Sequence, residues 1–307
     1  TISEVSKMNW QEDISEAIDY MEKHLTDKLK IEDVCNHVYA SPFYFQKGFH
    51  IFTGYTISEY IRNRRLYEAA LEIIQTNEKI IEIAYKYGYD TPESFTKAFT
   101  RFHGSTPLLV KKIKKVKVFL PLKIKIEIKG GHKMKNLQEN LTIEKMSAFK
   151  VIGFTKKFNF ETSYQEIPQF WDEVFDNYLQ PIFSLGKCKN EVDQAILENK
   201  IGEFGVCIDE GSNGEFRYMI AGKYNGGAIP KGMDVFEFPE LVWAKFKIEG
   251  PMPKSLQDTN TMIFREWLPN NPEYKIAKGY NIEWYSEKGK TTDADYESAI
   301  WIPVEKR

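Results

Sequence analysis

Hydrophobic residues recur at helical spacing through the first third of the chain. Between residues 10 and 25 they fall every three or four positions, which places them on one face of an amphipathic helix, at Ile14, Ala17, Ile18, Met21 and Leu25. The pattern also predicts a short helix at residues 31–39 and a helix of about twenty residues at 56–76. The first part of the chain is therefore expected to be all-α.

Two segments fifty residues apart follow one pattern. They are SPFYFQKGFHIFTG at residues 41–54 and TPESFTKAFTRFHG at residues 91–104. Each opens with Ser or Thr and then Pro, which favour a helix start, and ends with Gly, which favours a helix stop. Each also carries three phenylalanines on one helical face. A short helix is predicted before each segment, and at an offset of fifty Val34 pairs with Ala84 and Tyr39 with Tyr89.

Two helices joined by a tight turn form a helix-turn-helix, whose second helix can enter the DNA major groove. Two copies held by a long helix could read adjacent major grooves, about 34 Å apart. The repeated residues would then be scaffold, and the varied residues near each helix start would face bases. An ordinary helical bundle is the alternative, but it needs no repeat with cap, Pro, Lys and Gly in register.

The segment IAYKYGYDTPESFTKAFTRFHGSTPLLVKK resembles the signature of the AraC/XylS transcriptional regulators. It has the I-A-x-x-x-G-[YF] start, the S-x-F-x-[RK]-x-F core and the G-x-[ST]-P exit, and the resemblance covers residues 10–112. In that family both second helices contact bases. By position the resemblance implies DNA contacts from Phe43, Tyr44, Gln46 and Lys47 in the first unit, and from Glu93, Ser94, Thr96 and Lys97 in the second.

The chemistry of these side chains suits base edges. Gln46 can bond adenine through two hydrogen bonds, and Phe43 can contact a thymine methyl group. Glu93 could accept from cytosine or only complement the helix dipole. Lys47 and Lys97 stand where the family often has Arg, so they can reach guanine but lack the two-pronged guanidinium geometry.

Three arginines cluster on the predicted connecting helix, at positions 62, 64 and 65. Phosphate contacts position a protein on DNA without reading its sequence. Arg62 is the candidate for this role. The alternatives are a solvated helix face, or ion pairs with Glu59 and Glu68.

A lysine-rich stretch follows the helical part. Ten lysines lie between Lys111 and Lys135, and GGHK within this stretch favours a flexible joint. The stretch could face nucleic acid or be a solvated linker. The net charge of −2 is unevenly spread, because basic residues exceed acidic ones by about five in residues 1–135 and fall short by about seven afterwards. We expect a DNA-binding domain at 8–113, a linker at 114–138 and a second domain at 139–307.

The second domain alternates β-branched and aromatic residues with polar ones. The pattern predicts two amphipathic helices, at 167–183 and 255–268, and strands at 141–158, 204–210, 216–224, 240–250, 280–287 and 298–306. The order strand–helix–strand–strand thus occurs twice, which suggests one sheet with both helices on a single face. The expected fold class is multidomain, with an all-α double helix-turn-helix domain followed by an α+β domain.

Residues 140–305 are similar to the GyrI-like, or AraC effector-binding, domain. The cues are VIGF, EWLPNNPEY, YNIEWYSE and AIWIPVEK in that order. In many members a pocket binds lipophilic, often cationic, molecules through aromatic side chains and one carboxylate, which by position is Glu283. Glu283 and Tyr285 share one face of their strand. The alternatives are an exposed surface Glu and ordinary core aromatics; the candidate pocket walls are Tyr164, Trp171, Phe204, Trp243 and Trp267.

The domain order resembles the Rob-type regulators of drug and stress responses. It implies a DNA-binding transcription regulator, with a leaning to activation, controlled by a hydrophobic and often cationic small molecule. The expected partners are double-stranded DNA, this effector and RNA polymerase, with no membrane. Two alternatives stay open: a GyrI-like hydrolase with Glu283 as general base, and a constitutive DNA-binding protein whose second domain binds another protein.

The sequence indicates no catalytic group, metal site or cofactor. The three cysteines lack metal-ligand spacing and suggest reduced thiols. The first residues show no signal-peptide pattern, and no apolar run approaches the about 18 residues that span a bilayer. A non-enzymatic, cytoplasmic protein is therefore expected.

Overall fold

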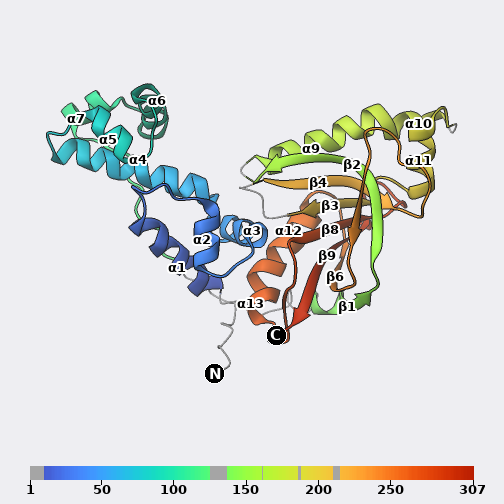
Figure 1. Ribbon diagram of the computed structural model, residues 1–307. Coiled ribbons are helices and arrows are strands. Elements are labelled where there is room, and N and C mark those ends of the chain that lie inside the picture. The colour runs from blue at the N-terminus through green and yellow to red at the C-terminus, as the bar shows by residue number, and fades with distance from the viewer. Residues whose placement is uncertain (1–9, 125–136, 161, 186–187, 210–214) are drawn as a thin grey trace. The chain divides into compact units, whose positions relative to one another are not determined.

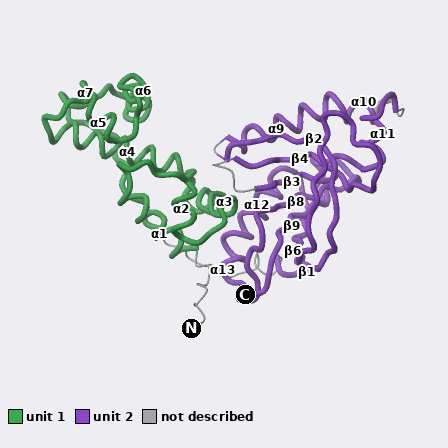
Figure 2. The backbone as a smooth tube through the Cα atoms, viewed as in Figure 1, with its two compact units in different colours: residues 1–126 green, residues 127–307 purple. Residues whose placement is uncertain are grey.

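The computed structural model describes residues 10–124, 137–160, 162–185, 188–209 and 215–307. Contacts between Cα atoms divide the chain into two compact units, residues 1–126 and residues 127–307 (Figure 2). Each unit is considered by itself below.

The regular elements that the structure describes in the first unit are all helices (Figure 1). Its two helix-turn-helix pairs are α2 with α3 and α5 with α6, and α4 is the long helix between the pairs. Its helices are α1 (Trp10–Lys23), α2 (Ile31–His37), α3 (Pro42–Thr53), α4 (Ile57–Gln75), α5 (Ile80–Lys86), α6 (Pro92–His103) and α7 (Pro107–Ile113).

The predicted caps lie at the helix ends. Thr56 accepts a hydrogen bond from Glu59 N at the start of α4, and Thr91 does the same for Ser94 N in α6. Gly54 and Gly104 end α3 and α6 in the left-handed region, with φ of 76° and 72°. These polar and glycine signals set the helix boundaries locally.

The turn between the two helices is one residue shorter in the first unit than in the second. α2 and α5 begin at Ile31 and Ile80, 49 positions apart, whereas the helices after the turn begin fifty positions apart. Left-handed backbone follows each first helix, at Tyr39 (φ 52°) and at Gly88 (φ 81°). The predicted pairing of Tyr39 with Tyr89 is therefore wrong by one residue, because Tyr39 corresponds to Gly88.

The same shift applies inside the first helix of each unit. Ala40 N bonds Cys35 O at 3.0 Å, and Tyr89 N bonds Ala84 O at 3.1 Å, which makes Cys35 the counterpart of Ala84. Both side chains are fully buried. Val34 corresponds instead to Ile83, so its predicted pairing with Ala84 is also corrected.

Residues 114–124 form an extended arm that packs on the helical unit. The Phe119 ring lies 5.3 Å from that of Tyr55 and 6.1 Å from those of Tyr60 and Phe102. Lys117 N donates to His103 Nδ1 at 3.1 Å. This part of the predicted linker is thus held by the helices, while residues 125–136 lie outside the described residues.

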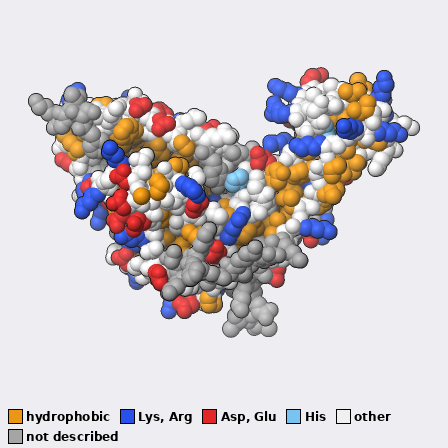
Figure 3. Space-filling view, turned by 180° about the vertical axis from the view of Figure 1, so that it is seen from behind, with side chains coloured by type: hydrophobic (Ala, Val, Ile, Leu, Met, Phe, Trp, Pro, Cys, Tyr) orange, Lys and Arg blue, Asp and Glu red, His pale blue; other side chains and the backbone are white. Residues whose placement is uncertain are grey.

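The outward side of the arm mixes apolar and basic side chains. Val118 and Leu120 are 61% and 62% exposed, and the neighbouring lysines are also exposed. Figure 3 shows a band of hydrophobic side chains on the helical unit with lysine and arginine side chains beside it. The lysines of the arm remain open to solvent or to a polyanion.

The described residues of the second unit include one antiparallel sheet of nine strands, in the order β1-β6-β9-β8-β3-β4-β2-β5, with β7 beside β9. The strands are β1 (Leu141–Met146), β2 (Phe149–Asn159), β3 (Phe204–Ile208), β4 (Glu215–Lys223), β5 (Asp234–Phe238), β6 (Leu241–Glu249), β7 (Tyr274–Ile276), β8 (Tyr280–Tyr285) and β9 (Glu297–Lys306).

Two long helical segments accompany the sheet, and each contains a π-helical turn. The first comprises α9 (Ser163–Val174), η1 (Phe175–Leu179) and α10 (Gln180–Leu185), and α11 (Glu191–Asn199) follows it. The second comprises α12 (Lys254–Met262), η2 (Ile263–Trp267) and α13 (Leu268–Asn270). The predicted strand–helix–strand–strand order is therefore present twice.

Each strand–helix–strand–strand repeat forms one half of the sheet. Each half also pairs with one strand that is adjacent in sequence to the other half. The single strand predicted at 141–158 is two strands, β1 and β2, separated by two residues. β1 pairs with β6 of the second half, and β5 pairs with β2 of the first half. The sequence pattern missed this exchange because strand alternation is local, whereas the choice of pairing partner depends on long-range packing.

The two faces of the sheet have different roles. One face carries an apolar cluster that includes Phe204, Trp243 and Ile282. The helices pack on the other face, where Phe170 of α9 lies 5.7 Å from Phe158 and Trp267 of η2 lies 5.0 Å from Phe246. This confirms the expectation of helices on a single face, and it places any helix-lined site on the face opposite the cluster.

Candidate DNA-reading helix and ligand site

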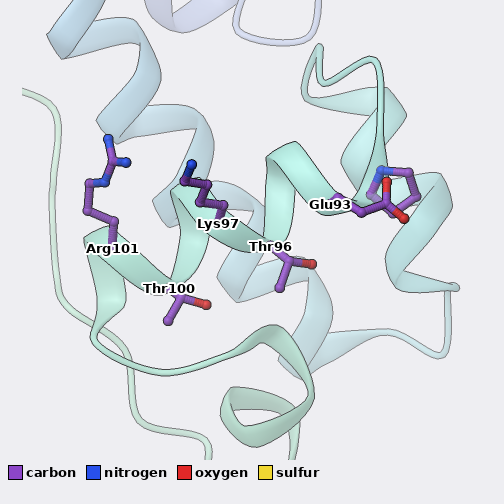
Figure 4. Close-up of a pocket in the computed structure, with 6 residues that line it drawn as sticks. Glu93, Thr96, Lys97, Thr100 and Arg101 are labelled. Atoms are coloured by element: carbon purple, nitrogen blue, oxygen red, sulfur yellow. The ribbon is translucent and has the colours of Figure 1, made fainter.

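The second recognition helix, α6, presents a polar face to solvent. Six of its residues line an open hollow: Pro92, Glu93, Thr96, Lys97, Thr100 and Arg101. Figure 4 shows Lys97 and Arg101 one turn apart on one side of the helix. Ser94 is exposed and donates its hydroxyl to Thr91 O at 2.8 Å. Phe95 and Phe99 are fully buried on the opposite side. The exposed face therefore carries hydrogen-bonding side chains of the kinds that can contact base edges.

Thr100 and Arg101 were missed by the sequence reasoning. They lie three and four positions after Lys97, so they extend the same helical face by one turn. Helical spacing counted beyond the helix start would have found them.

The corresponding helix of the first unit, α3, carries larger and more apolar side chains at its start than α6. Phe43, Tyr44 and Gln46 are 3%, 1% and 7% exposed. The rings of Phe43 and Tyr44 meet at 5.0 Å, and Gln46 Nε2 bonds back to Pro42 O at 3.3 Å. Large apolar rings gain free energy by leaving water, which the polar residues of α6 do not. Lys47 is partly exposed, and its Nζ lies 5.8 Å from the Phe43 ring.

The three arginines of α4 have separate roles. Arg62 is exposed, as phosphate contact requires. Arg64 is 3% exposed and bonds both carboxylate oxygens of Glu22 at 2.8 Å. Arg65 donates to the backbone carbonyls of residues 25 and 27. Of these three, Arg62 is the one whose side chain is exposed.

Glu283 lies on the helix face of β8 within a group of aromatic side chains. Its Oε2 accepts hydrogen bonds from the hydroxyls of Tyr285 at 2.8 Å and Tyr218 at 3.0 Å. Trp171 Nε1 from α9 donates to the Tyr218 hydroxyl at 2.9 Å, and its ring meets that of Tyr285 edge-on at 5.3 Å. Three of these four were predicted: Glu283, Tyr285 and Trp171.

Gly205 makes room for this arrangement. It pairs with Glu283 across β3 and β8, and a Cβ at this position would lie 2.1 Å from the Tyr218 hydroxyl and 3.0 Å from Glu283 Oε2. The absent side chain lets Tyr218 of β4 reach past β3 to the carboxylate. Tyr218 and Gly205 were missed because their meeting with Glu283 depends on strand order and register, which the sequence pattern did not give.

The two phenols of the site remain hydrogen-bond donors at neutral pH. Burial raises the pKa of Tyr218 and of Tyr285 well above the ordinary tyrosine value, and the negative charge of Glu283 raises both further. Both hydroxyls therefore stay protonated and donate to the carboxylate. A site built from one carboxylate and aromatic rings favours a positively charged, apolar guest.

Other predicted pocket walls lie elsewhere. Phe204 and Trp243 belong to the apolar cluster on the opposite face, so they cannot line a site at Glu283. Alternation along β3 and β6 turns their side chains away from it. Trp267 is 6% exposed and packs on the helix face against Phe246 of the other half. Tyr164 lies in α9, but its side chain falls outside the described residues.

Among the helices that the structure describes, none is both long enough and apolar enough to cross a bilayer. Within the same residues, no three histidine, cysteine or acidic side chains gather in a way that could hold a metal ion.

Known proteins match both units. A model of the GyrI-like small molecule binding domain matches residues 139–305, and a model of a helix-turn-helix domain matches residues 34–112. The HTH-type transcriptional activator AarP of Providencia stuartii is 38% identical over 96 residues, which cover 31% of this chain and 71% of AarP. The right origin-binding protein of Escherichia coli K12 is 27% identical over 168 residues, which cover 53% of this chain and 57% of that protein.

Solved structures resemble each unit in turn. The structure of SAV2435 bound to tetraphenylphosphonium is 23% identical, with a TM-score of 0.43, and covers 54% of this chain and 93% of that one. An AraC-type regulator from Chromobacterium violaceum is 24% identical, with a TM-score of 0.33, and covers 33% of this chain and 91% of that one. By the two domain models and the sequence relatives, the chain belongs to the transcription regulators that join an N-terminal AraC-type helix-turn-helix domain to a C-terminal GyrI-like small molecule binding domain.

Proposed function

We propose that this regulator activates transcription when a lipophilic organic cation binds at Glu283. The observation that carries the proposal is the hydrogen-bonded group of Glu283, Tyr285, Tyr218 and Trp171 on the helix face of the sheet. Its parts come from α9, β4 and β8, so a guest at the carboxylate would contact several elements at once.

The charge of the guest follows from the chemistry of the site. A carboxylate beside aromatic side chains costs solvation free energy unless it is paired. Two phenol hydroxyls satisfy Oε2, and Oε1 takes part in neither bond. A cation would complete the pairing through Oε1, and the indole and phenol rings would add cation–π attraction.

The DNA-binding half acts through double-stranded DNA in the cytoplasm. In this proposal α6 reads bases through Glu93, Ser94, Thr96 and Lys97, and Arg62 positions the protein on the phosphates. α3 contributes Lys47, whose side chain is partly exposed. Activation would then proceed through contact with RNA polymerase; the relative AarP is a transcriptional activator by its name.

The test is thermal stabilisation of the whole chain by two ions of the same shape and opposite charge, tetraphenylphosphonium and tetraphenylborate. At one hundred times its dissociation constant a ligand adds about 2.7 kcal/mol. We expect the cation to stabilise the wild type, the borate to have no effect, and Glu283→Gln to lose the response. Glu287→Gln is the matched control, because Glu287 is exposed and pairs with Lys200.

A reporter carrying a DNA site selected with the whole chain then tests the response. Transcription should rise with the cation in the wild type and not in Glu283→Gln. The cation site would be overturned if the two ions stabilised the wild type equally, or if the cation stabilised Glu283→Gln as much as the wild type. Turnover of the added compound would instead support the hydrolase alternative.

A further inference from the structure

Asn281 is a buried side chain whose hydrogen-bonding capacity is unused within the described part of the chain. The residue is 1% exposed, and neither its Nδ2 nor its Oδ1 has a hydrogen-bond partner there. Buried polar groups are nearly always paired, because an unpaired one loses its hydrogen bonds to water and gains none in return. A carboxamide left in this state therefore needs an explanation.

Its position on the sheet relates it to the candidate ligand site. Tyr280, Ile282 and Trp284 of β8 face the apolar cluster, so alternation turns Asn281 to the helix face with Glu283. Two residues along a strand correspond to about 7 Å. Its neighbour across the ladder is Cys207, which in turn pairs with Tyr218. The amide thus lies in the next row of side chains from the carboxylate.

A second buried asparagine in this unit shows the usual arrangement. Asn199 is 4% exposed, its Nδ2 donates to Ala195 O at 2.9 Å, and its Oδ1 accepts from Asn225 N at 3.2 Å. The two side chains have the same chemistry and similar burial. They differ in their hydrogen bonds: the Asn199 side chain bonds two backbone groups, whereas the Asn281 side chain bonds no group within the described residues.

We propose that Asn281 is the second polar contact for the effector, and that the effector is an organic cation bearing a carboxamide or another group that both donates and accepts. The cation would pair with Glu283, and the polar group would reach Asn281 one row deeper. This inference rests on the proposed function, because it assumes that the guest binds at Glu283. It adds a selectivity that a carboxylate and aromatic rings alone do not give.

The test is a double-mutant cycle in which a carboxamide is replaced by an apolar group of similar shape, once in the protein and once in the ligand. The ligands are carbamoylmethyl-triphenylphosphonium and isobutyl-triphenylphosphonium, which have equal charge and similar shape. The proteins are the wild type and Asn281→Leu, each as the whole chain. Isothermal titration gives the four affinities. We expect the wild type to favour the carboxamide by about tenfold or more, and Asn281→Leu to lose or reverse this ratio.

The melting temperatures of the ligand-free proteins give an independent measurement. Asn281→Leu should raise the melting temperature, because it removes an unpaired amide. Asn199→Leu should lower it, because it leaves partners unpaired.

The outcomes separate the two proposals. Equal affinities of the wild type for both phosphonium ions would overturn the role of Asn281, even if Asn281→Leu failed to fold. The cation site would still stand if both ions bound and Glu283→Gln abolished their binding. If neither ion bound the wild type, both proposals would fall together.

Discussion

Replacing Arg64 with methionine should loosen the helical unit without changing Arg62, the proposed phosphate contact on the same helix. Arg64 joins three parts of the unit through its guanidinium group. It bonds both oxygens of Glu22 in α1, Glu68 of its own helix at 2.6 Å, and the backbone carbonyl of Phe119 in the arm. Methionine fills a similar volume but provides none of these donors.

The expected cost follows from the burial of the partners. Arg64 is 3% exposed, whereas Glu22 and Glu68 are 20% and 32% exposed. Breaking a buried ion pair costs about 3–5 kcal/mol. Because both carboxylates can recover some water, and Glu22 keeps the Tyr60 hydroxyl at 2.7 Å, we expect the lower end, about 3 kcal/mol. For a unit of this size that corresponds to about 10 °C in melting temperature.

Hydrogen exchange followed by mass spectrometry is the suitable assay, because the chain has two units whose global melting curves can overlap. Peptides from α4 and the arm should exchange faster in Arg64→Met, while those from β8 and β9 should not change. Arg62→Ala is the matched control from the same helix. It should leave hydrogen exchange in α4 unaltered and weaken binding to duplex DNA. The slope of log affinity against log salt concentration should become shallower by about one.

Two results would refute this reasoning. If Arg64→Met left α4 and the arm as protected as in the wild type, the buried ion pairs would contribute little. If Arg62→Ala disturbed stability and Arg64→Met did not, the assignment of one arginine to structure and the other to DNA would be reversed.

Two further predictions concern the stability of the helical unit, measured by denaturant unfolding. Tyr39→Gly should stabilise it by about 1 kcal/mol and Gly88→Ala should destabilise it by a similar amount, since both positions have left-handed backbone and Tyr39 is 95% exposed. A less stable Tyr39→Gly protein would show that the tyrosine ring stabilises the helical unit by more than the left-handed backbone costs. Burial, followed by the charges of Glu16 and Glu12, raises the pKa of Asp13 to about 7, so stability should fall as pH rises from about 4 to 7. Asp13→Asn should remove this fall and raise the free energy of unfolding by about 1–2 kcal/mol at pH 8, after allowance for the partial exposure of Asp13. No gain is expected at pH 4. An equal gain at both pH values would exclude the titration of Asp13 as its cause.

Much of the site could be found from local pattern alone. Strand alternation placed Glu283 and Tyr285 on one face, and helical spacing placed Trp171 on a helix beside the sheet. Helix caps and phenylalanine spacing gave the two helix-turn-helix units. These signals need only neighbouring residues, because side-chain direction repeats every two residues in a strand and every 3.6 in a helix.

Local patterns could not show which face of the sheet holds the candidate site, or which distant residues meet there. Phe204 and Trp243 alternate as well as Glu283 does, yet they belong to the opposite face, because register and strand order decide which rows meet. Phe43 and Tyr44 stand where the second unit has Glu93 and Ser94, yet the first two are buried and the other two are exposed. Apolar side chains gain free energy by burial wherever a neighbour can cover them, and the sequence does not show that neighbour.

The sequence by itself determined the two kinds of domain, their order, the repeated helix-turn-helix units and the carboxylate that marks the candidate ligand site. Each of these rests on short-range periodicity, on caps or on motif residues. The tertiary structure alone decided that Tyr218, 65 residues before Glu283, donates to it across Gly205. It also decided that β1 and β5 pair with strands of the opposite half, and that Arg64 is buried in ion pairs while Arg62 is exposed. These features depend on contacts between distant segments, and such contacts are set by packing of the whole unit rather than by any local pattern.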